Sequence, residues 1–538
     1  MENLVAPKKC ILLGIGGTGA KVVEAALILM ASGLGPSKVH VGLIDQDMAN
    51  GNVARTQTLV NNLVNFRKAW FTKGADNFLD WSDNSAFRFG AVEILPLFEA
   101  AAASGQKDGT CIWCPERNEG TLRGIVGRGL SPEESELFDL LFMANEEEQR
   151  LDLSQGYRGR AHVGSAALAA TLIDDSNLLI KRISDEVDSG SYNEIDIFLA
   201  GSAFGGTGAA GFPTVARSLM RLKSETHERK GFKNRDKVFI GGQLMLPYFT
   251  FSGPEDDSGP SVVTADELMP KAQLALEYYD NLLKHEKAFD RLYVTGWNRL
   301  FDLKYHKPGS AEQTNPALLP ELVAATAVLD FFGRDNAQEA RAEPANTDVP
   351  VLNSARQNHV IKWADMPSGK AVRIRLGQAL RFAASWRYEG RALLTEDRKI
   401  FRKIVKNWAQ QLSGSVNVAD AEDALNALDA VLDNILKWAA TIEATGDASW
   451  VRGPWTLDGL NDPTHQPVPT EPVRLASQID KSRFRDAFNN MIRVDSGDPE
   501  PRSANTSFEI AVEAKPSRGD HKGIGKAIAV LYDSVAVG

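Results

Sequence analysis

Short apolar runs alternate with stretches of helical periodicity from residue 8 to about residue 332. The apolar runs predict buried strands, and apolar positions three and four residues apart between them predict amphipathic helices. Strands are expected at residues 10–13, 39–44, 195–200, 238–246 and 292–295, and helices at residues 20–31, 165–174, 213–224 and 265–283. Residues 50–159 are less regular and are expected to hold one strand and inserted helices. Alternating strands and helices indicate an α/β fold with a mostly parallel sheet.

The pattern changes after residue 315. Asn315 and Pro316 are expected to open an apolar, buried helix that ends at Phe332, because proline suits the first turn of a helix. Further on, we expect loops at residues 334–370, helices at 373–406 and 424–442, linkers at 452–474 and 495–506, and an edge strand at 507–514. The predicted organisation is an α/β domain (residues 1–315), a central helix (316–333) and a mainly helical C-terminal region (334–538).

Composition narrows the class of protein. The chain has 538 residues, of which 43% are hydrophobic and 24% charged, as in soluble globular domains. Its formal net charge of −10 argues against a general binder of nucleic acid or anionic membranes. Three cysteines do not make a disulfide framework, the amino terminus has no signal-peptide pattern, and no apolar run is long enough to span a bilayer. We therefore expect a cytoplasmic protein that binds neither nucleic acid nor membrane.

Two glycine-rich segments each follow a predicted strand and precede a predicted helix. The first comprises Gly14, Ile15, Gly16, Gly17, Thr18 and Gly19, and the second comprises Gly205, Gly206, Thr207 and Gly208. Glycine lets backbone N–H groups approach phosphate oxygens, and the positive end of a helix dipole favours an anion there. The two segments therefore predict phosphate-binding loops on one sheet.

The first segment alone allows another interpretation. Its glycines form a GxGxxG motif, and Asp45 ends the following strand, near where a dinucleotide-binding fold places the acid that binds ribose. It also approaches a Walker A motif, but Lys21 is followed by Val22, which has no hydroxyl to bind magnesium. A Walker P-loop is therefore rejected, and the dinucleotide interpretation is kept.

The second glycine segment gives the chain a resemblance to the tubulin/FtsZ superfamily. The run FGGTGAA at residues 204–210 is close to the superfamily signature GGGTG[ST]G. Further along, PYFTFSG at residues 247–253 resembles the PFxFEG segment of bacterial FtsZ, and LYVTGWNRL at 292–300 resembles the strand and NDRL turn before the central helix. Residues 315–332 are similar to that central helix, and residues 156–164 occupy the place of a third nucleotide loop. The resemblance covers residues 8–335 and lies in the order of these segments.

The resemblance implies a GTP/GDP site with Mg²⁺. The phosphates would be held by the two glycine segments, with Gly159 and Arg160 near the terminal phosphate. The residues that it implies for nucleotide binding are Gly14, Gly16, Gly17, Thr18, Lys21, Asp45, Gly159, Arg160, Gly205, Gly206, Thr207, Gly208, Pro247, Ser252, Asn298 and Asn315. Asp45 and Asp47 are the magnesium candidates, and Asn298 and Asn315 would read the base, because an amide both donates and accepts hydrogen bonds.

Some residues depart from the superfamily pattern. Lys21 stands where Asn or Gln is usual, and Ser252 stands where a ribose-binding Glu is usual. In the superfamily, acidic residues after the central helix of one subunit position the attacking water in the next subunit. Here Asp335 and Glu339 are the candidates for that catalytic role, and a merely solvated charged loop is the alternative interpretation.

Three functions follow from these patterns. The first is a tubulin/FtsZ-like protein that binds GTP, assembles head-to-tail with copies of itself and completes a slow GTPase site at the subunit interface. The second is a nucleotide-dependent switch or scaffold that does not hydrolyse GTP and recruits a companion protein through its helical C-terminal region. The third is a dinucleotide-dependent oxidoreductase that uses the first glycine segment alone.

Overall fold

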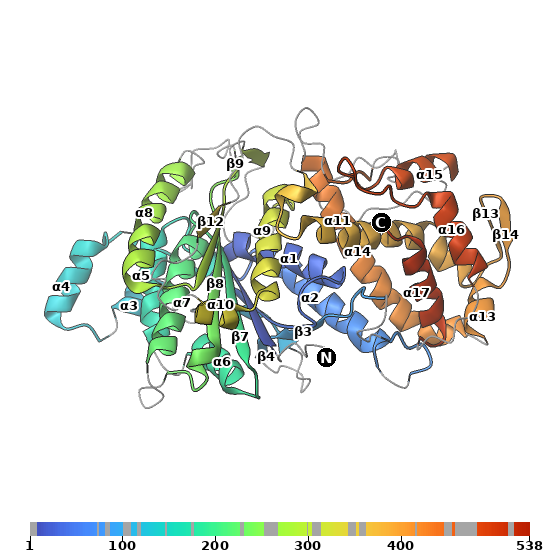
Figure 1. The fold of residues 1–538 in the computed structure, drawn as a ribbon. Coiled ribbons are helices and arrows are strands. Elements are labelled where there is room, and N and C mark those ends of the chain that lie inside the picture. The colour runs from blue at the N-terminus through green and yellow to red at the C-terminus, as the bar shows by residue number, and fades with distance from the viewer. Residues whose placement is uncertain are drawn as a thin grey trace.

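A parallel sheet forms the centre of this computed structural model (Figure 1). Within the described residues it has eight strands, and every pairing is parallel. Their order across the sheet is β12 (Val351–Asn353), β10 (Arg291–Thr295), β8 (Val238–Met245), β7 (Glu194–Ser202), β1 (Lys8–Ile15), β2 (Lys38–Ile44) and β3 (Glu93–Pro96), with β6 (Ile112–Trp113) also paired to β2. The chain winds one way from β1 and the other way from β7, so the order of strands reverses between these two neighbours.

The structure describes most of the chain. The described residues are 8–72, 75–80, 87–99, 109–115, 120–127, 129–145, 148–173, 177–225, 231–251, 267–297, 300–303, 314–342, 351–353, 362–414, 417–445, 454–457, 481–514 and 521–537. Within them no helix is long and apolar enough to cross a membrane.

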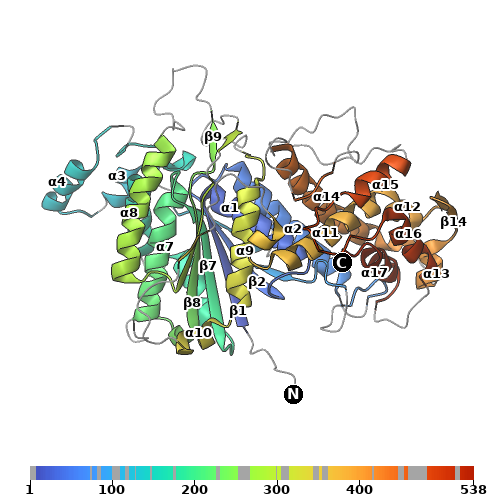
Figure 2. The same ribbon diagram turned by 45° about the horizontal axis from the view of Figure 1, so that its top comes forward.

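Helices cover both faces of the sheet, which makes three layers (Figure 2). One face carries α1 (Gly16–Ala31), α2 (Gly51–Trp70) and α9 (Leu319–Gly333), and the other carries α5 (Ala161–Ile173), α6 (Leu178–Asp188), α7 (Thr207–Ser224) and α8 (Leu268–Glu286). Leu12 of β1 belongs to the first core, whereas its neighbours Ile11 and Leu13 belong to the second. The sequences of such strands are continuous apolar runs, because helices cover both faces of the sheet.

Short elements connect these layers. They are β4 (Phe98–Glu99), β5 (Gly109–Thr110), α3 (Leu122–Val126), α4 (Pro132–Leu141), β9 (Phe249–Phe251), β11 (Phe301–Leu303) and α10 (Asn336–Ala342). β9 and β11 pair as a small parallel sheet of their own.

The C-terminal region packs against the outer side of α2. Its elements are α11 (Gly369–Ser385), α12 (Arg391–Leu393), β13 (Arg398–Ile400), β14 (Lys403–Val405), α13 (Trp408–Ser413), α14 (Glu422–Thr445), α15 (Lys481–Asn489), α16 (Ala504–Glu513) and α17 (Ile524–Ser534). The indole N–H of Trp70 on α2 donates to the Ala424 carbonyl over 2.7 Å, and Asn62 Nδ2 donates to Asn434 Oδ1 over 2.7 Å. The apolar side chains of α1, α2, α9, α11, α14 and α17 form one continuous core.

Several sequence predictions are wrong in this part of the chain. Residues 507–514 were expected to form an edge strand, but they lie in α16, where the buried residues Ala504, Ser507, Phe508 and Ala511 follow helical spacing. The expected loop at 334–370 contains α10 and the edge strand β12, and the second half of the expected helix at 373–406 holds the hairpin β13–β14.

Candidate functional site

The two glycine segments lie side by side where the order of strands reverses. Helix α1 follows β1 directly and begins at Gly16, and helix α7 follows β7 and begins at Thr207. Most of the expected loop glycines therefore belong to first helical turns. Neither helix has a hydrogen bond from its N-cap side chain, and the first N–H groups of a helix have no partner within the helix itself. In open α/β sheets, ligands bind in the crevice at this reversal point.

The two helix starts touch each other. Gly16 has φ +71, and a Cβ atom added there would lie 2.9 Å from the backbone nitrogen of Gly208. An alanine at Gly16 would therefore be strained and would push the helix starts apart. Gly205 also has a positive φ, +82, but a Cβ atom there would meet no atom within 4 Å. Only its backbone conformation requires glycine.

The third predicted loop, residues 156–164, lies beside the starts of α1 and α7. Gly156, Arg158 and Gly159 have positive φ, and Arg160 immediately precedes α5. A Cβ atom added to Gly206 would lie 2.9 Å from Tyr157 Cβ and 3.1 Å from the Gly159 nitrogen. The amino termini of α1, α5 and α7 thus converge at the carboxyl ends of the strands.

Asp45 joins the loop after β2 to the second glycine segment. Its Oδ1 accepts hydrogen bonds from the Thr207 hydroxyl (2.8 Å) and the Asp47 N–H (3.1 Å), and its Oδ2 accepts one from Asn50 Nδ2 (3.0 Å). Burial raises the pKa of Asp45 to about 7, although hydrogen bonds from Thr207, Asp47 and Asn50 oppose that rise. Asp45 and Thr207 are therefore bonded to each other in this structure.

Both magnesium candidates accept hydrogen bonds in this structure. Both oxygens of Asp45 accept them, and Asp47 Oδ1 accepts one from the Ala49 N–H (2.9 Å). Among the described residues, no three or more His, Cys, Asp and Glu side chains are grouped to hold a metal ion. A magnesium ion bound with phosphates needs only one or two protein carboxylates. Asp45 and Asp47 are two such carboxylates, and both lie directly after β2.

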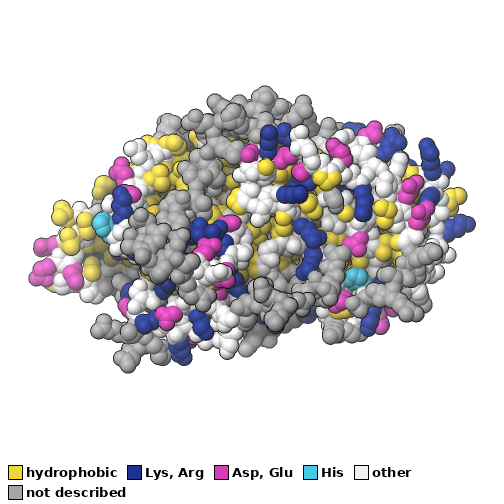
Figure 3. Space-filling model, viewed as in Figure 1, with side chains coloured by type: hydrophobic (Ala, Val, Ile, Leu, Met, Phe, Trp, Pro, Cys, Tyr) yellow, Lys and Arg dark blue, Asp and Glu magenta, His cyan; other side chains and the backbone are white. Residues whose placement is uncertain are grey.

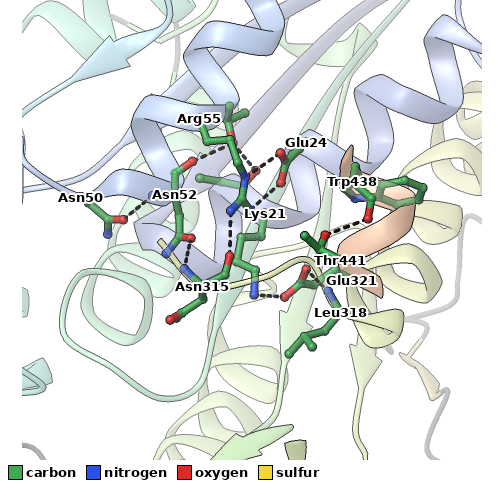
Figure 4. Close-up of polar contacts among 12 residues, drawn as sticks. Lys21, Glu24, Asn50, Asn52, Arg55, Asn315, Leu318, Glu321, Trp438 and Thr441 are labelled. Carbon is green, nitrogen blue, oxygen red and sulfur yellow. Dashed lines mark hydrogen bonds and ion pairs between the residues drawn. The ribbon is translucent and has the colours of Figure 1, made fainter. Parts of the chain in front are cut away.

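The Lys21 side chain contacts α9. Its ammonium is buried and forms an ion pair with Glu321 Oε1 of α9 (Figure 4). The Tyr248 hydroxyl donates to the same Glu321 oxygen over 2.6 Å and interacts with the Thr18 hydroxyl. Burial lowers the pKa of Lys21, and Glu321 opposes that change. Two residues expected at the nucleotide, Lys21 and Thr18, thus belong to a polar cluster between α1 and α9.

A second cluster holds Asn315 by its backbone. Arg55 of α2 makes two hydrogen bonds to the Glu24 carboxylate, both 2.7 Å, and a third of 2.7 Å to the Asn315 carbonyl. The Asn52 side chain accepts the Asn315 N–H over 2.9 Å (Figure 4). The predicted base reader is thereby fixed beside α1 and α2, just before α9.

The remaining nucleotide candidates are only partly described. Pro247 is buried between β8 and β9, next to Tyr248. Ser252 and Asn298 lie outside the described residues.

The proposed catalytic acids lie at the opposite edge of the sheet. Glu339 forms ion pairs with Arg334 and Arg291, each 2.9 Å, and Arg291 is the first residue of β10. The exposed Asp335 accepts the Gln338 N–H over 2.7 Å. Lys8, the first residue of β1, donates to the Arg334 carbonyl over 2.8 Å. Figure 2 shows α10 at the lower ends of the strands, whereas α1 starts near their upper ends.

Sequence reasoning missed five residues of the two clusters, namely Glu24, Asn52, Arg55, Tyr248 and Glu321. Glu321 had a detectable signal, since an acid in the first turn of an apolar, buried helix implies a buried partner. Arg55 had none, because its two partners are Glu24 on another helix and a backbone carbonyl 260 residues away.

The convergence of three helix amino termini creates a surface suited to a multiply charged anion such as a phosphate chain. The third loop, which meets this surface through Tyr157 and Gly159, also carries Arg158 and Arg160. Comparison with known proteins finds no matching family model, curated protein or solved structure.

Proposed function

We propose that this chain is a GTP-binding protein of the tubulin/FtsZ type. The observation that carries the proposal is the contact between the starts of α1 and α7 at the point where the strand order reverses, with Gly16 against Gly208. Two glycine-rich helix starts can surround a phosphate chain from both sides, which a fold with one such loop does not do. The order of the three loops along the chain supports the same assignment.

The phosphates, the base and the cation would be bound by different parts of this edge. Backbone N–H groups of Gly17, Thr18 and Gly208 would hold the phosphates, with Arg160 as a charge partner. Asp45 or Asp47 would hold Mg²⁺ together with phosphate oxygens. Asn315, fixed through Asn52 and Arg55, would read the base.

The proposed head-to-tail assembly would use the two opposite ends of the parallel strands. The glycine segments are at the carboxyl ends of the strands, and Asp335 and Glu339 are at the amino ends. Stacking one copy on the next along the strand direction would bring the acids of one copy to the nucleotide of its neighbour. Such a heterologous contact gives open filaments, with hydrolysis completed between subunits.

One observation favours the alternative of a switch or scaffold without hydrolysis. Glu339 already pairs with Arg334 and Arg291, and an acid held by two cations is less able to polarise a water molecule. In this alternative, GTP would change the conformation of the chain and the helical C-terminal region would recruit a companion protein.

The dinucleotide-dependent oxidoreductase has the least support. That function would need Asp45 to bind a ribose hydroxyl, but its oxygens already accept hydrogen bonds from Thr207, Asp47 and Asn50. Absorbance of NAD(P) or flavin in the purified protein would favour this function instead.

The test measures GTP binding, phosphate release and light scattering on the purified chain over a series of protein concentrations. A polymerising GTPase releases more phosphate per molecule as concentration rises, and its scattering depends on GTP. Tight binding without release or scattering would favour the switch or scaffold. Absence of GTP binding would overturn both.

A mixing experiment tests catalysis between subunits. Glu339→Gln removes a proposed catalytic acid, and Gly205→Ala places a methyl group on the glycine segment where no protein atom lies within 4 Å. Each variant alone should release little phosphate. An equal mixture should regain part of the activity, because each copy supplies what the other lacks. Lack of recovery, with both variants folded, would contradict catalysis in trans.

A further inference from the structure

At one end of the molecule, a helix has an exposed apolar face with acidic residues next to it. In α4 and the residues that flank it, 131–143, Leu137, Leu140, Leu141 and Met143 have 54%, 82%, 63% and 55% of their surface exposed. Leu137, Leu140 and Leu141 are three and four residues apart, so they share one face. The same residues include four acids and no Lys or Arg. We call residues 131–143 the acidic knob.

The acidic knob does not need its leucines to fold. Ser131 and Glu134 form a reciprocal capping box, with hydrogen bonds of 3.2 Å and 2.8 Å. Phe138 anchors the helix on the other side, where it is buried beneath the Arg123 guanidinium, 5.2 Å from the ring centre. A cluster of exposed leucines on a helix held in these two ways is typical of a contact surface for another molecule.

The opposite end of the molecule carries the complementary charge. Residues 398–406, the hairpin β13–β14, contain five Lys and Arg residues and no acid. We call them the basic hairpin. Arg398 pairs with Glu389 and Lys403 pairs with Glu513, whereas Lys399, Arg402 and Lys406 are exposed and make no ion pair within the described residues. Ile404 in the same hairpin has 69% of its surface exposed.

The two surfaces lie at the two ends of the long axis in both ribbon views (Figures 1 and 2). Figure 3 shows hydrophobic and acidic side chains together at the end formed by α4, and basic side chains projecting at the other end. We propose that the acidic knob of one copy docks on the basic hairpin of a second copy, with the leucines against Ile404 and the acids against Lys399, Arg402 and Lys406. Because the two surfaces differ, repetition of this contact builds an open row of copies.

This contact goes beyond the proposed function and is independent of nucleotide. The line that joins the acidic knob to the basic hairpin runs across the strands in Figure 1. The head-to-tail stacking proposed above runs along the strands instead. In a protein that also stacks along the strands, the contact would join neighbouring filaments laterally. In a protein that does not, it would join copies into single rows.

A charge-reversal experiment tests the contact in the full chain without nucleotide. Sedimentation velocity over a concentration series should show self-association of the wild type that weakens with salt, because opposite charges contribute to it. The knob variant (Glu133→Lys with Glu136→Lys) and the hairpin variant (Lys399→Glu with Arg402→Glu) should each associate at least about tenfold more weakly, since like charges then meet. The control Glu277→Lys, an exposed reversal on α8, should associate like the wild type.

Mixing the two variants gives the decisive result. The reversed knob matches the reversed hairpin, and the unchanged surfaces also match, so an equal mixture should associate nearly as well as the wild type. A monomeric wild type, a knob variant that associates normally, or a mixture that stays dissociated would each overturn the proposal. GTP binding by the same variants is measured in parallel, and its failure would count against the proposed function alone. Far-UV circular dichroism verifies that every variant is folded.

Discussion

The Thr207 hydroxyl donates a hydrogen bond of 2.8 Å to Asp45 Oδ1, across 162 positions of sequence. This bond ties the loop after β2 to the start of α7, at the edge where three helix amino termini converge. Asp45 is buried and also accepts hydrogen bonds from Asp47 and Asn50. A carboxyl group in this position makes the stability of the edge sensitive to pH.

Stability should fall as pH rises through the titration of Asp45. Burial raises its pKa from the usual 3.8 to about 7, so the folded protein favours the protonated form. That contribution is fully present below the unfolded pKa of 3.8 and is lost as pH rises through about 7. Each pKa unit corresponds to about 1.4 kcal/mol, so the loss between about pH 5 and about pH 8 is about 3 kcal/mol. Urea denaturation of the wild type and Asp45→Asn at several pH values measures it.

The comparison with Asp45→Asn isolates this one group. Asparagine has no titrating group at position 45. The free energy of unfolding of Asp45→Asn, relative to that of the wild type, should therefore increase as pH rises. Curves for Asp45→Asn that run parallel to those of the wild type would show that Asp45 stays ionised in the folded protein.

Three glycine-to-alanine substitutions should rank by local geometry. Gly16→Ala should cost the most, about 2–4 kcal/mol, because its positive φ is strained and its methyl group would collide with the Gly208 backbone. Gly205→Ala should cost about 1 kcal/mol, since only its φ is unfavourable. Gly333→Ala has neither problem and serves as the control. Urea midpoints give the order, and equal costs at Gly16 and Gly205 would argue against the contact between the helix starts.

The buried ion pair of Lys21 and Glu321 should behave as one unit. Lys21→Met leaves a buried carboxylate without its cation and should cost about 3–5 kcal/mol. Glu321→Gln should also be costly, because it leaves the buried ammonium without its counter-charge and weakens the acceptor of Tyr248. The double variant should cost clearly less than the sum of the two. A double-mutant cycle from urea denaturation measures the coupling, and additive costs would refute it.

The strands were predictable from the sequence because the sheet is buried on both faces. The five strands expected from apolar runs all lie within or nearly coincide with β1, β2, β7, β8 and β10. The short edge strand β12 was missed, since it has three residues directly after Pro350 and resembles a loop. In α16, alternating residues suggested a strand, although Ser503 carried the signal of a helix cap and its hydroxyl accepts the Thr506 N–H. The two-residue alternation of a strand was chosen there in place of the spacing of three and four residues that is typical of a helix.

The arrangement of the candidate site was predictable where it depends on backbone groups. It was not predictable where a side chain's environment depends on partners far away in the sequence. Gly16, Gly206 and Gly208 could be grouped because glycine before a helix signals close backbone approach. The burial of Lys21 could not be predicted, because its environment is decided by Glu321, 300 positions later on another helix. Local spacing contains no information about that packing.

The geometry of Arg55 gives the last prediction. Its guanidinium holds Glu24 by two hydrogen bonds and the Asn315 carbonyl by a third, an arrangement that needs a planar fork of donors. Arg55→Lys keeps the charge but reaches only one of these acceptors at a time. It should cost about 2–3 kcal/mol of stability, since Glu24 is almost fully buried.

The matched control is Arg217→Lys, which alters the Arg217–Glu286 pair on the surface, where both side chains are about half exposed. That change should cost at most about 0.5 kcal/mol. If Asn315 reads the base, Arg55→Lys should also weaken GTP binding, because the backbone that carries Asn315 loses one of its two anchors. Urea denaturation and calorimetric titration with GTP measure the two effects. Loss of stability with unchanged GTP affinity would separate Asn315 from base recognition, and equal costs for both substitutions would contradict the importance of the fork.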